Sequence, residues 1–177
     1  GWERKESERN TITLLRGMAL VNLGMAGHEI TLQKLTAIFQ FIKEGQNGID
    51  PNIRGAVYNI AAWTGNEATY HYFLERYKVE KVPEESRKLL RALGLFKEKH
   101  LLEKALDLSQ SSIVRLQDSV MIPMIVSINP AVEPSLLWHW TKTNWKMLMK
   151  KYGGGTHMLP SFVHNLSVAD TKAQHNT

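Results

Sequence analysis

Apolar residues recur along this chain at intervals of three and four positions, which is the spacing of one face of an α-helix. The first stripe contains Ile12, Leu15 and Met18, and the second contains Leu35 and Phe39. No segment alternates Val, Ile or Thr with polar residues, as a half-buried strand would. This periodicity predicts an all-α fold in which each stripe faces the core.

Start and stop signals divide the periodic segments into separate helices. Asp50 before Pro51 is typical of a helix start, because the carboxylate caps the first turn and proline lacks an N–H that would have no partner there. Gly65 ends that helix, and Asn66 caps the next one. We predict seven to nine helices, and the short turns between them make neighbouring helices antiparallel.

A helix is expected over 114–128, with a kink or a fresh turn at Pro123. Arg115, Gln117 and Asp118 stand at the head of this otherwise apolar segment. In the structural interpretation, which we favour, Asp118 stabilises the helix start and pairs with Arg115. In the functional interpretation, Arg115 and Gln117 line a cleft and bind a carboxylate.

A long amphipathic helix is expected from about residue 135 to residue 152. Trp138, Trp145 and Tyr152 recur at every seventh position in it, so we predict that this aromatic stripe lies in the core. A truncation at Trp145 would then cost about 3–5 kcal/mol of stability.

A row of lysines, Lys142, Lys146 and Lys150, follows a different face of the same segment. A solvated face is the favoured interpretation, since the aliphatic stems can cover apolar neighbours. The functional alternative is that the row faces an acidic surface, either of a companion domain or of peptide carboxylates.

The stretch "GHEITL" begins like the zinc signature H-E-x-x-H and then departs from it. The position of the second histidine is occupied by Leu32, which cannot bind a metal. Glu29 instead suits the positive end of a helix. Because the chain also lacks cysteine, we predict no metal, no cofactor and no catalytic residue in it.

The composition is ordinary for a soluble globular protein, with 177 residues of which 43% are hydrophobic. No apolar run is long enough to span a membrane. The net charge of +5 is compatible with nucleic-acid binding, but no nucleic-acid-binding motif accompanies it, so we expect no such partner. The composition does not determine the cellular compartment, and a cytoplasmic location is favoured.

Three blocks of the sequence resemble the C-terminal helical domain of M1-family zinc aminopeptidases. They begin "PNIRGAVYNIAAW", "SRKLLRALGLFKEKH" and "NWKMLMKKYGGG", and the resemblance extends over about residues 14–166, most closely to the puromycin-sensitive and aminopeptidase N branch. It implies a HEAT-like α-α superhelix, an irregular solenoid of antiparallel helix pairs. It also implies that residues 1–177 are a single helical domain, cut from a larger C-terminal domain.

The resemblance implies a non-catalytic function. In this family the zinc and the catalytic residues belong to a preceding domain, whose H-E-x-x-H and G-x-M-E-N motifs are absent here. The helical domain caps the active-site chamber and limits or assists the access of peptides. Its partners would be the catalytic domain of the same polypeptide and peptide substrates. A basic-x-Gln-acid pattern of the family is matched by Arg115, Gln117 and Asp118. The match implies that these residues matter in the domain, either for packing or for contact with a peptide.

A free-standing α-solenoid that binds other proteins is the alternative function. A helical stack that lacks its end helices exposes apolar faces, so self-association is a further expectation.

Overall fold

A computed structural model describes residues 9–46, 48–133, 135–154, 160, 162–164, 166 and 167. Within these residues there are helices and turns but no strand, so the all-α prediction is confirmed for the described part of the chain. The elements are α1 (Asn10–Met25), α2 (Glu29–Lys43), α3 (Pro51–Trp63), α4 (Glu67–Val79), α5 (Pro83–Leu93), α6 (Lys99–Gln110), the short 3-10 helix η1 (Leu116–Asp118), α7 (Met121–Ile128) and α8 (Ser135–Tyr152).

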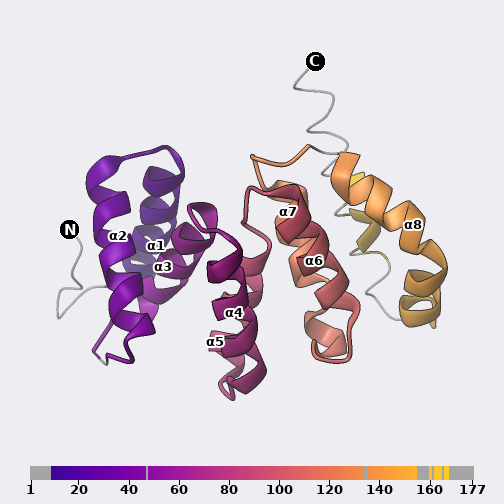
Figure 1. Ribbon diagram of the computed structural model, residues 1–177, viewed down its shortest axis with the longest axis horizontal. Helices are drawn as coiled ribbons and strands as arrows, with labels where there is room; N and C mark the ends of the chain where they lie inside the picture. The colour runs from indigo at the N-terminus through magenta and orange to yellow at the C-terminus, as the bar shows by residue number, and fades with distance from the viewer. Residues whose placement is uncertain are drawn as a thin grey trace.

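The helices form a row along the longest axis of the molecule (Figure 1). The helices α1, α2 and α3 lie at one end, and α8 lies at the other. Along the row α1 packs on α3, α3 on α5 and α5 on α7, while α2, α4 and α6 pack on α3, α5 and α7 in turn. Each odd-numbered helix up to α7 therefore contacts the next odd-numbered helix. The last helix, α8, packs on α6 and α7.

The predicted helix starts are present. The carboxylate of Asp50 accepts a hydrogen bond from the N–H of Asn52 at 2.9 Å, and the amide oxygen of Asn66 accepts one from the N–H of Thr69 at 3.3 Å. The "GHEITL" stretch also begins a helix, since Nδ1 of His28 accepts from the N–H of Thr31 at 3.3 Å. This stretch is a helix cap, which satisfies an N–H group that has no partner within the helix.

An aromatic cluster forms the centre of the core and joins three helices to the turn after α5. Phe73 of α4 is fully buried, and its ring centre lies 5.5 Å from that of Phe39 and 5.6 Å from that of Tyr58. Phe96 extends the cluster through Tyr70, at 5.7 Å between ring centres. Edge-on and tilted pairs of this kind add to the stabilisation from burial.

The apolar stripe predicted as the core face of the first helix is exposed instead. Ile12, Leu15 and Met18 of α1 all lie on the surface of the described structure, while Leu20 is buried. The face that meets α3 includes Gly24, where an added Cβ would lie 2.6 Å from Cδ1 of Ile60. A small residue lets two helices approach closely. The face of α1 that packs on α3 is therefore the one that contains its glycines, and the apolar stripe lies on another face.

The prediction that the aromatic stripe of α8 lies in the core is wrong for two of its three members. Trp138 is 50% exposed and Trp145 is 43% exposed, whereas Tyr152 is fully buried beside the buried Leu148. The physical reason is tertiary contact, because the ring of Phe162 stacks on that of Tyr152 with 6.1 Å between ring centres, and the Tyr152 hydroxyl donates to Oγ of Ser119 at 2.7 Å. Burial depends on which neighbouring element covers a side chain, and membership of the stripe alone does not decide it.

The single helix expected over 114–128 is divided in two. The 3-10 helix η1 contains Gln117 and Asp118, and α7 begins only at Met121. Pro123 lies in the first turn of α7, where its missing N–H leaves no helical hydrogen bond unmade. A new helix therefore begins at Met121, with Pro123 in its first turn, and Arg115 precedes a 3-10 helix, not an α-helix.

Candidate functional site

Asp118 is nearly fully buried, with 3% of its surface exposed, and two guanidinium groups hold its carboxylate. Nε and Nη2 of Arg115 lie 2.8 and 2.6 Å from Oδ2, and Nε of Arg87 lies 3.3 Å from Oδ1. A buried carboxylate is stable only when such partners offset its loss of hydration. The expected Arg115–Asp118 pair is present, and Arg87 also joins η1 to α5.

A cavity of about 410 Å³ lies beside Arg115, at the turn between α4 and α5. Its basic lining residues are Lys78, Lys81 and Arg115, and its acidic one is Glu80. The carboxylate of Glu80 already accepts the two backbone N–H groups that follow it, at 2.9 and 3.0 Å. Lys78 already pairs with Glu75 at 2.6 Å, so Lys81 and Arg115 supply the positive charge of the wall, and Arg115 keeps 46% of its side chain exposed to offer hydrogen-bond donors.

Tyr77 and Gln117 are the other two residues to be placed relative to this cavity. Tyr77 lines the wall, and burial, followed by the nearby Asp118 carboxylate, raises its pKa above the ordinary value. Gln117 is exposed on η1 and does not belong to the lining. Of the three residues singled out in the sequence, the structure therefore brings Arg115 to the cavity, buries Asp118 behind it, and leaves Gln117 outside.

The lysine row lies on the exposed side of α8. Lys142, Lys146 and Lys150 are all exposed, and Nζ of Lys142 lies 5.7 Å from the ring centre of Trp138. The helix has no Asp or Glu anywhere in its 18 residues. The exposed Trp138 and Trp145 lie next to the lysines, so this face combines positive charge with aromatic surface. Neither α8 nor any other described helix has the length and apolarity of a membrane span.

A groove of about 1000 Å³ lies between α6 and α8, and no sequence motif indicates it. One wall carries Asp107, whose Oδ1 accepts a hydrogen bond from Nε1 of Trp140 at 2.7 Å. Its charged lining residues carry both signs and are Lys97, Lys99, Glu103, Asp107 and Glu133. Because its two walls come from residues 97–107 and 131–144, which are separate segments of the chain, no local motif could have revealed it.

The described residues do not fit a zinc site of the kind that the family resemblance implies for a parent enzyme. No group of three His, Cys, Asp or Glu side chains in the described part of the chain could hold a metal ion. His28 caps α2, and His71 lies 3.8 Å from Glu67 on the same exposed face of α4. Protein zinc sites take three or four such ligands, and neither histidine has that set around it among the described residues.

Comparison with known proteins places this architecture in a family. The family model described as "ERAP1-like C-terminal domain" matches residues 1–175. Glutamyl aminopeptidase of Bos taurus is 30% identical over 141 residues, which cover 78% of this chain and 15% of that protein. Aminopeptidase M1-A of Oryza sativa subsp. japonica is 28% identical over 159 residues, which cover 87% of this chain and 18% of that protein.

Aminopeptidase N of Mus musculus is 28% identical over 130 residues, which cover 72% of this chain and 13% of that protein. The chain thus spans less than a fifth of the length of these three relatives. The family match covers nearly the whole chain and agrees with the resemblance found in its motifs. This chain belongs to the family of ERAP1-like C-terminal domains of M1 aminopeptidases.

Proposed function

We propose that this chain is a non-catalytic part of an M1 aminopeptidase, where it helps to cap the active-site chamber and controls the access of peptides. One observation carries the proposal: a chain matched to the C-terminal domain over residues 1–175 has open cavities with charged lining residues. The zinc and the catalytic groups would belong to another domain of the same polypeptide, and the 177 residues would act as one helical domain.

The cavity beside Arg115 is the proposed contact for a peptide carboxylate. Nε and Nη2 of Arg115 already contact Asp118, so Nη1 is the donor that such a group would meet, and Lys81 adds positive charge around it. Asp118 would position Arg115 from behind, through the 2.6 and 2.8 Å contacts. Gln117, exposed on η1, would be a secondary contact outside the cavity.

The lysine row of α8 is the proposed contact with an acidic surface of the catalytic domain. Three exposed ammonium groups on a helix without carboxylates repel one another slightly, by about 0.2–0.5 kcal/mol for each i, i+4 pair. A partner surface of opposite charge would remove this cost and orient the docking. The exposed rings of Trp138 and Trp145 would add apolar contact area to the same surface.

The proposal is tested in the full-length aminopeptidase. Replacing Lys142, Lys146 and Lys150 together by Glu should lower the turnover of long peptides while the hydrolysis of a short aminoacyl substrate stays unchanged. The loss should be largest at low ionic strength, where surface charges are least screened. As a control, Arg9 and Arg91, which are exposed and belong to other parts of the chain, are replaced by Glu, and this variant should behave like the parent enzyme.

A separate variant tests the cavity beside Arg115. Lys81→Glu reverses a lining charge without touching Asp118, so we expect a higher KM for long peptides and an unchanged kcat for the short substrate. If both the lysine-row variant and Lys81→Glu match the parent enzyme on long peptides at every salt concentration, the chain does not control peptide access. A free-standing interaction module would then be the better account.

A further inference from the structure

The groove between α6 and α8 has the size of a ligand-binding site and an apolar base. Its volume of about 1000 Å³ lies at the upper end of the range that is usual for ligand pockets. Leu102 of α6 and Leu136 and Trp140 of α8 line the groove and are buried, and together they form this base. The indole N–H of Trp140 is already bound to Asp107, so the side chains of the base offer a ligand apolar contact only.

The two lysines that line this groove already have partners. Nζ of Lys97 lies 5.0 Å from the ring centre of Trp63, which is outside the lining of the groove. Nζ of Lys99 lies 3.9 Å from Oε1 of Glu103, so these two charges offset each other. Neither lysine is therefore left to neutralise the other two carboxylates of the lining.

Those two carboxylates, Asp107 and Glu133, have only neutral partners among the described residues. The indole N–H of Trp140 donates to Oδ1 of Asp107 at 2.7 Å, and the hydroxyl of Ser135 lies 3.5 Å from Oε2 of Glu133. The contact with Trp140 orients the exposed carboxylate of Asp107 and leaves Oδ2 without a donor in the described structure. An oriented carboxylate with a spare oxygen is suited to a charge-assisted hydrogen bond from an ammonium or guanidinium group.

We propose that the groove between α6 and α8 binds a basic side chain of a peptide, with its charged head at Asp107 and its aliphatic stem on the apolar base. Lysine and arginine match both properties of the groove, since each carries a cation on an apolar stem. The identity of the peptide as a long substrate rests on the proposed function, whereas the recognition of the basic side chain does not. The groove is separate from the cavity beside Arg115, which would take a carboxylate.

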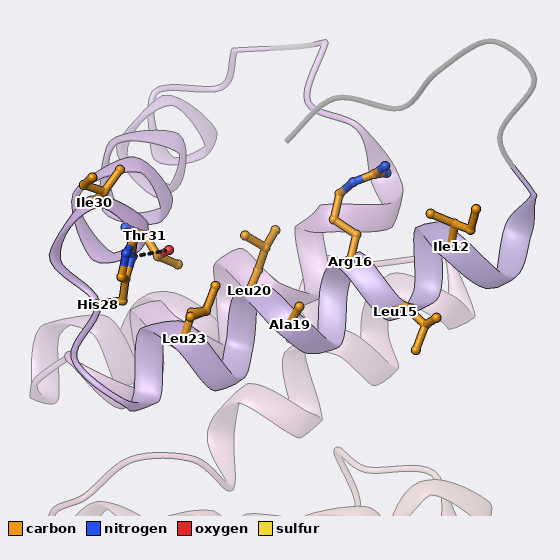
Figure 2. Close-up of a pocket in the computed structure, with 9 residues that line it drawn as sticks. All are labelled: Ile12, Leu15, Arg16, Ala19, Leu20, Leu23, His28, Ile30 and Thr31. Atoms are coloured by element: carbon orange, nitrogen blue, oxygen red, sulfur yellow. Dashed lines mark hydrogen bonds between the residues drawn. The ribbon is translucent and has the colours of Figure 1, made fainter. Parts of the chain in front are cut away.

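A second groove, between α1 and the first turn of α2, has a different character (Figure 2). Its lining is mainly apolar, and Arg16 and His28 are the titratable side chains among its described lining residues. This groove of about 460 Å³ therefore offers a cation no carboxylate from that lining. The chain as a whole carries a net charge of +5, so its average field also repels a basic peptide. Binding of such a peptide would accordingly report a local site, and the groove that contains Asp107 provides one.

A peptide that is blocked at both ends tests this groove alone. The probe is the acetylated and amidated pentapeptide GRGRG, and its partner GQGQG replaces each arginine by glutamine. Neither peptide has a carboxylate for the cavity beside Arg115 or a free amine for an aminopeptidase active site. In isothermal titration calorimetry with the full-length aminopeptidase at low salt, GRGRG should bind at least about fivefold more tightly than GQGQG.

Two variants assign the binding to the groove. Asp107→Asn keeps an acceptor oxygen for Trp140 and removes the charge, so it should weaken the binding of GRGRG by about threefold to tenfold in a protein that circular dichroism shows to be folded. Glu44→Gln removes one exposed negative charge at the end of α2 and should leave the affinity unchanged. Equal affinities of the natural protein for the two peptides, or an equal effect of the two substitutions, would overturn the proposal. The turnover of long peptides by the lysine-row and Lys81→Glu variants tests the proposed function separately.

Discussion

Nε1 of Trp140 on α8 donates a hydrogen bond to Oδ1 of Asp107 on α6, with a distance of 2.7 Å between the two atoms. Trp140 is buried, so its indole N–H has lost its water and needs a protein acceptor. The contact joins residues 33 positions apart and holds α8 against α6. Both residues line the groove that these two helices enclose.

Asp107→Ala should lower the free energy of unfolding by about 1.5–3 kcal/mol, because a buried N–H then loses a charged acceptor. Asp107→Asn keeps an acceptor oxygen and should cost less. Chemical denaturation of the three proteins, followed by circular dichroism, measures the difference. An Asn variant as unstable as the Ala variant would show that the hydrogen bond itself contributes little.

The two arginines at Asp118 should differ in their effect. Arg115→Ala should lower the free energy of unfolding by about 3–5 kcal/mol, because it removes the closer partner of a buried carboxylate. Arg87→Ala removes one contact of 3.3 Å and should cost clearly less. Denaturation midpoints of both variants check the order, and a larger loss for Arg87→Ala would contradict it.

Gly24→Ala should destabilise the contact between α1 and α3 by about 1–3 kcal/mol, since the new methyl group meets the buried side chain of Ile60. Gly17→Ala is the matched control on the same helix. An added Cβ there meets the backbone oxygen of Asn52 at an ordinary 3.6 Å, so helix propensity should stabilise this variant by up to about 1 kcal/mol.

A double variant makes the Gly24 test specific. Ile60→Ala removes the atoms that the new methyl group would meet, so adding Gly24→Ala to Ile60→Ala should cost less than adding it to the natural sequence. Thermal unfolding of the single and double variants gives this coupling. Strictly additive effects would show that the close approach of α1 to Ile60 has no energetic consequence.

Two buried tyrosines should make the fold sensitive to alkali. Burial, followed by the charge of Glu85 for Tyr58 and of Asp107 for Tyr70, raises the pKa of each to about 12 from 10.0. Because the folded state holds these protons more tightly, their stability contribution is full below pH 10 and is lost as the pH rises through 12.

The combined variant Tyr58→Phe and Tyr70→Phe should therefore lose less stability than the natural chain between pH 10 and pH 12. Denaturation at a series of pH values measures this difference, and the ultraviolet absorbance of tyrosinate reports the ionisation itself. If the free energy of unfolding of the two proteins changed equally with pH over that range, the burial of the two hydroxyl groups would be contradicted.

The corrected placement of α8 changes what truncations should do. Trp145→Ala should cost clearly less than the truncation of a buried ring, about 1–2 kcal/mol, because 43% of Trp145 is exposed. Tyr152→Ala should cost about 3–5 kcal/mol, since its ring is fully buried and its hydroxyl donates to Oγ of Ser119 at 2.7 Å. If both variants lost the same free energy of unfolding in a denaturation experiment, the prediction that Trp145 lies in the core would be correct after all.

The sequence by itself determined the helical class of the fold and many of its helix boundaries. Asp50 and Asn66 cap the helices that they were expected to cap, because a cap is a contact between residues two or three positions apart. The Arg115–Asp118 pair could be predicted for the same reason. The motifs also indicated the family, whose model matches residues 1–175.

The tertiary structure alone decided which faces are buried and where the cavities lie. Trp138 and Ile12 belong to apolar stripes and are nevertheless exposed, because burial depends on the neighbouring helix and not on the stripe itself. The Arg87–Asp118 and Trp140–Asp107 contacts join positions 31 and 33 residues apart. Periodicity within one helix holds no information about such pairs, since the packing angle between two helices selects the residues that meet.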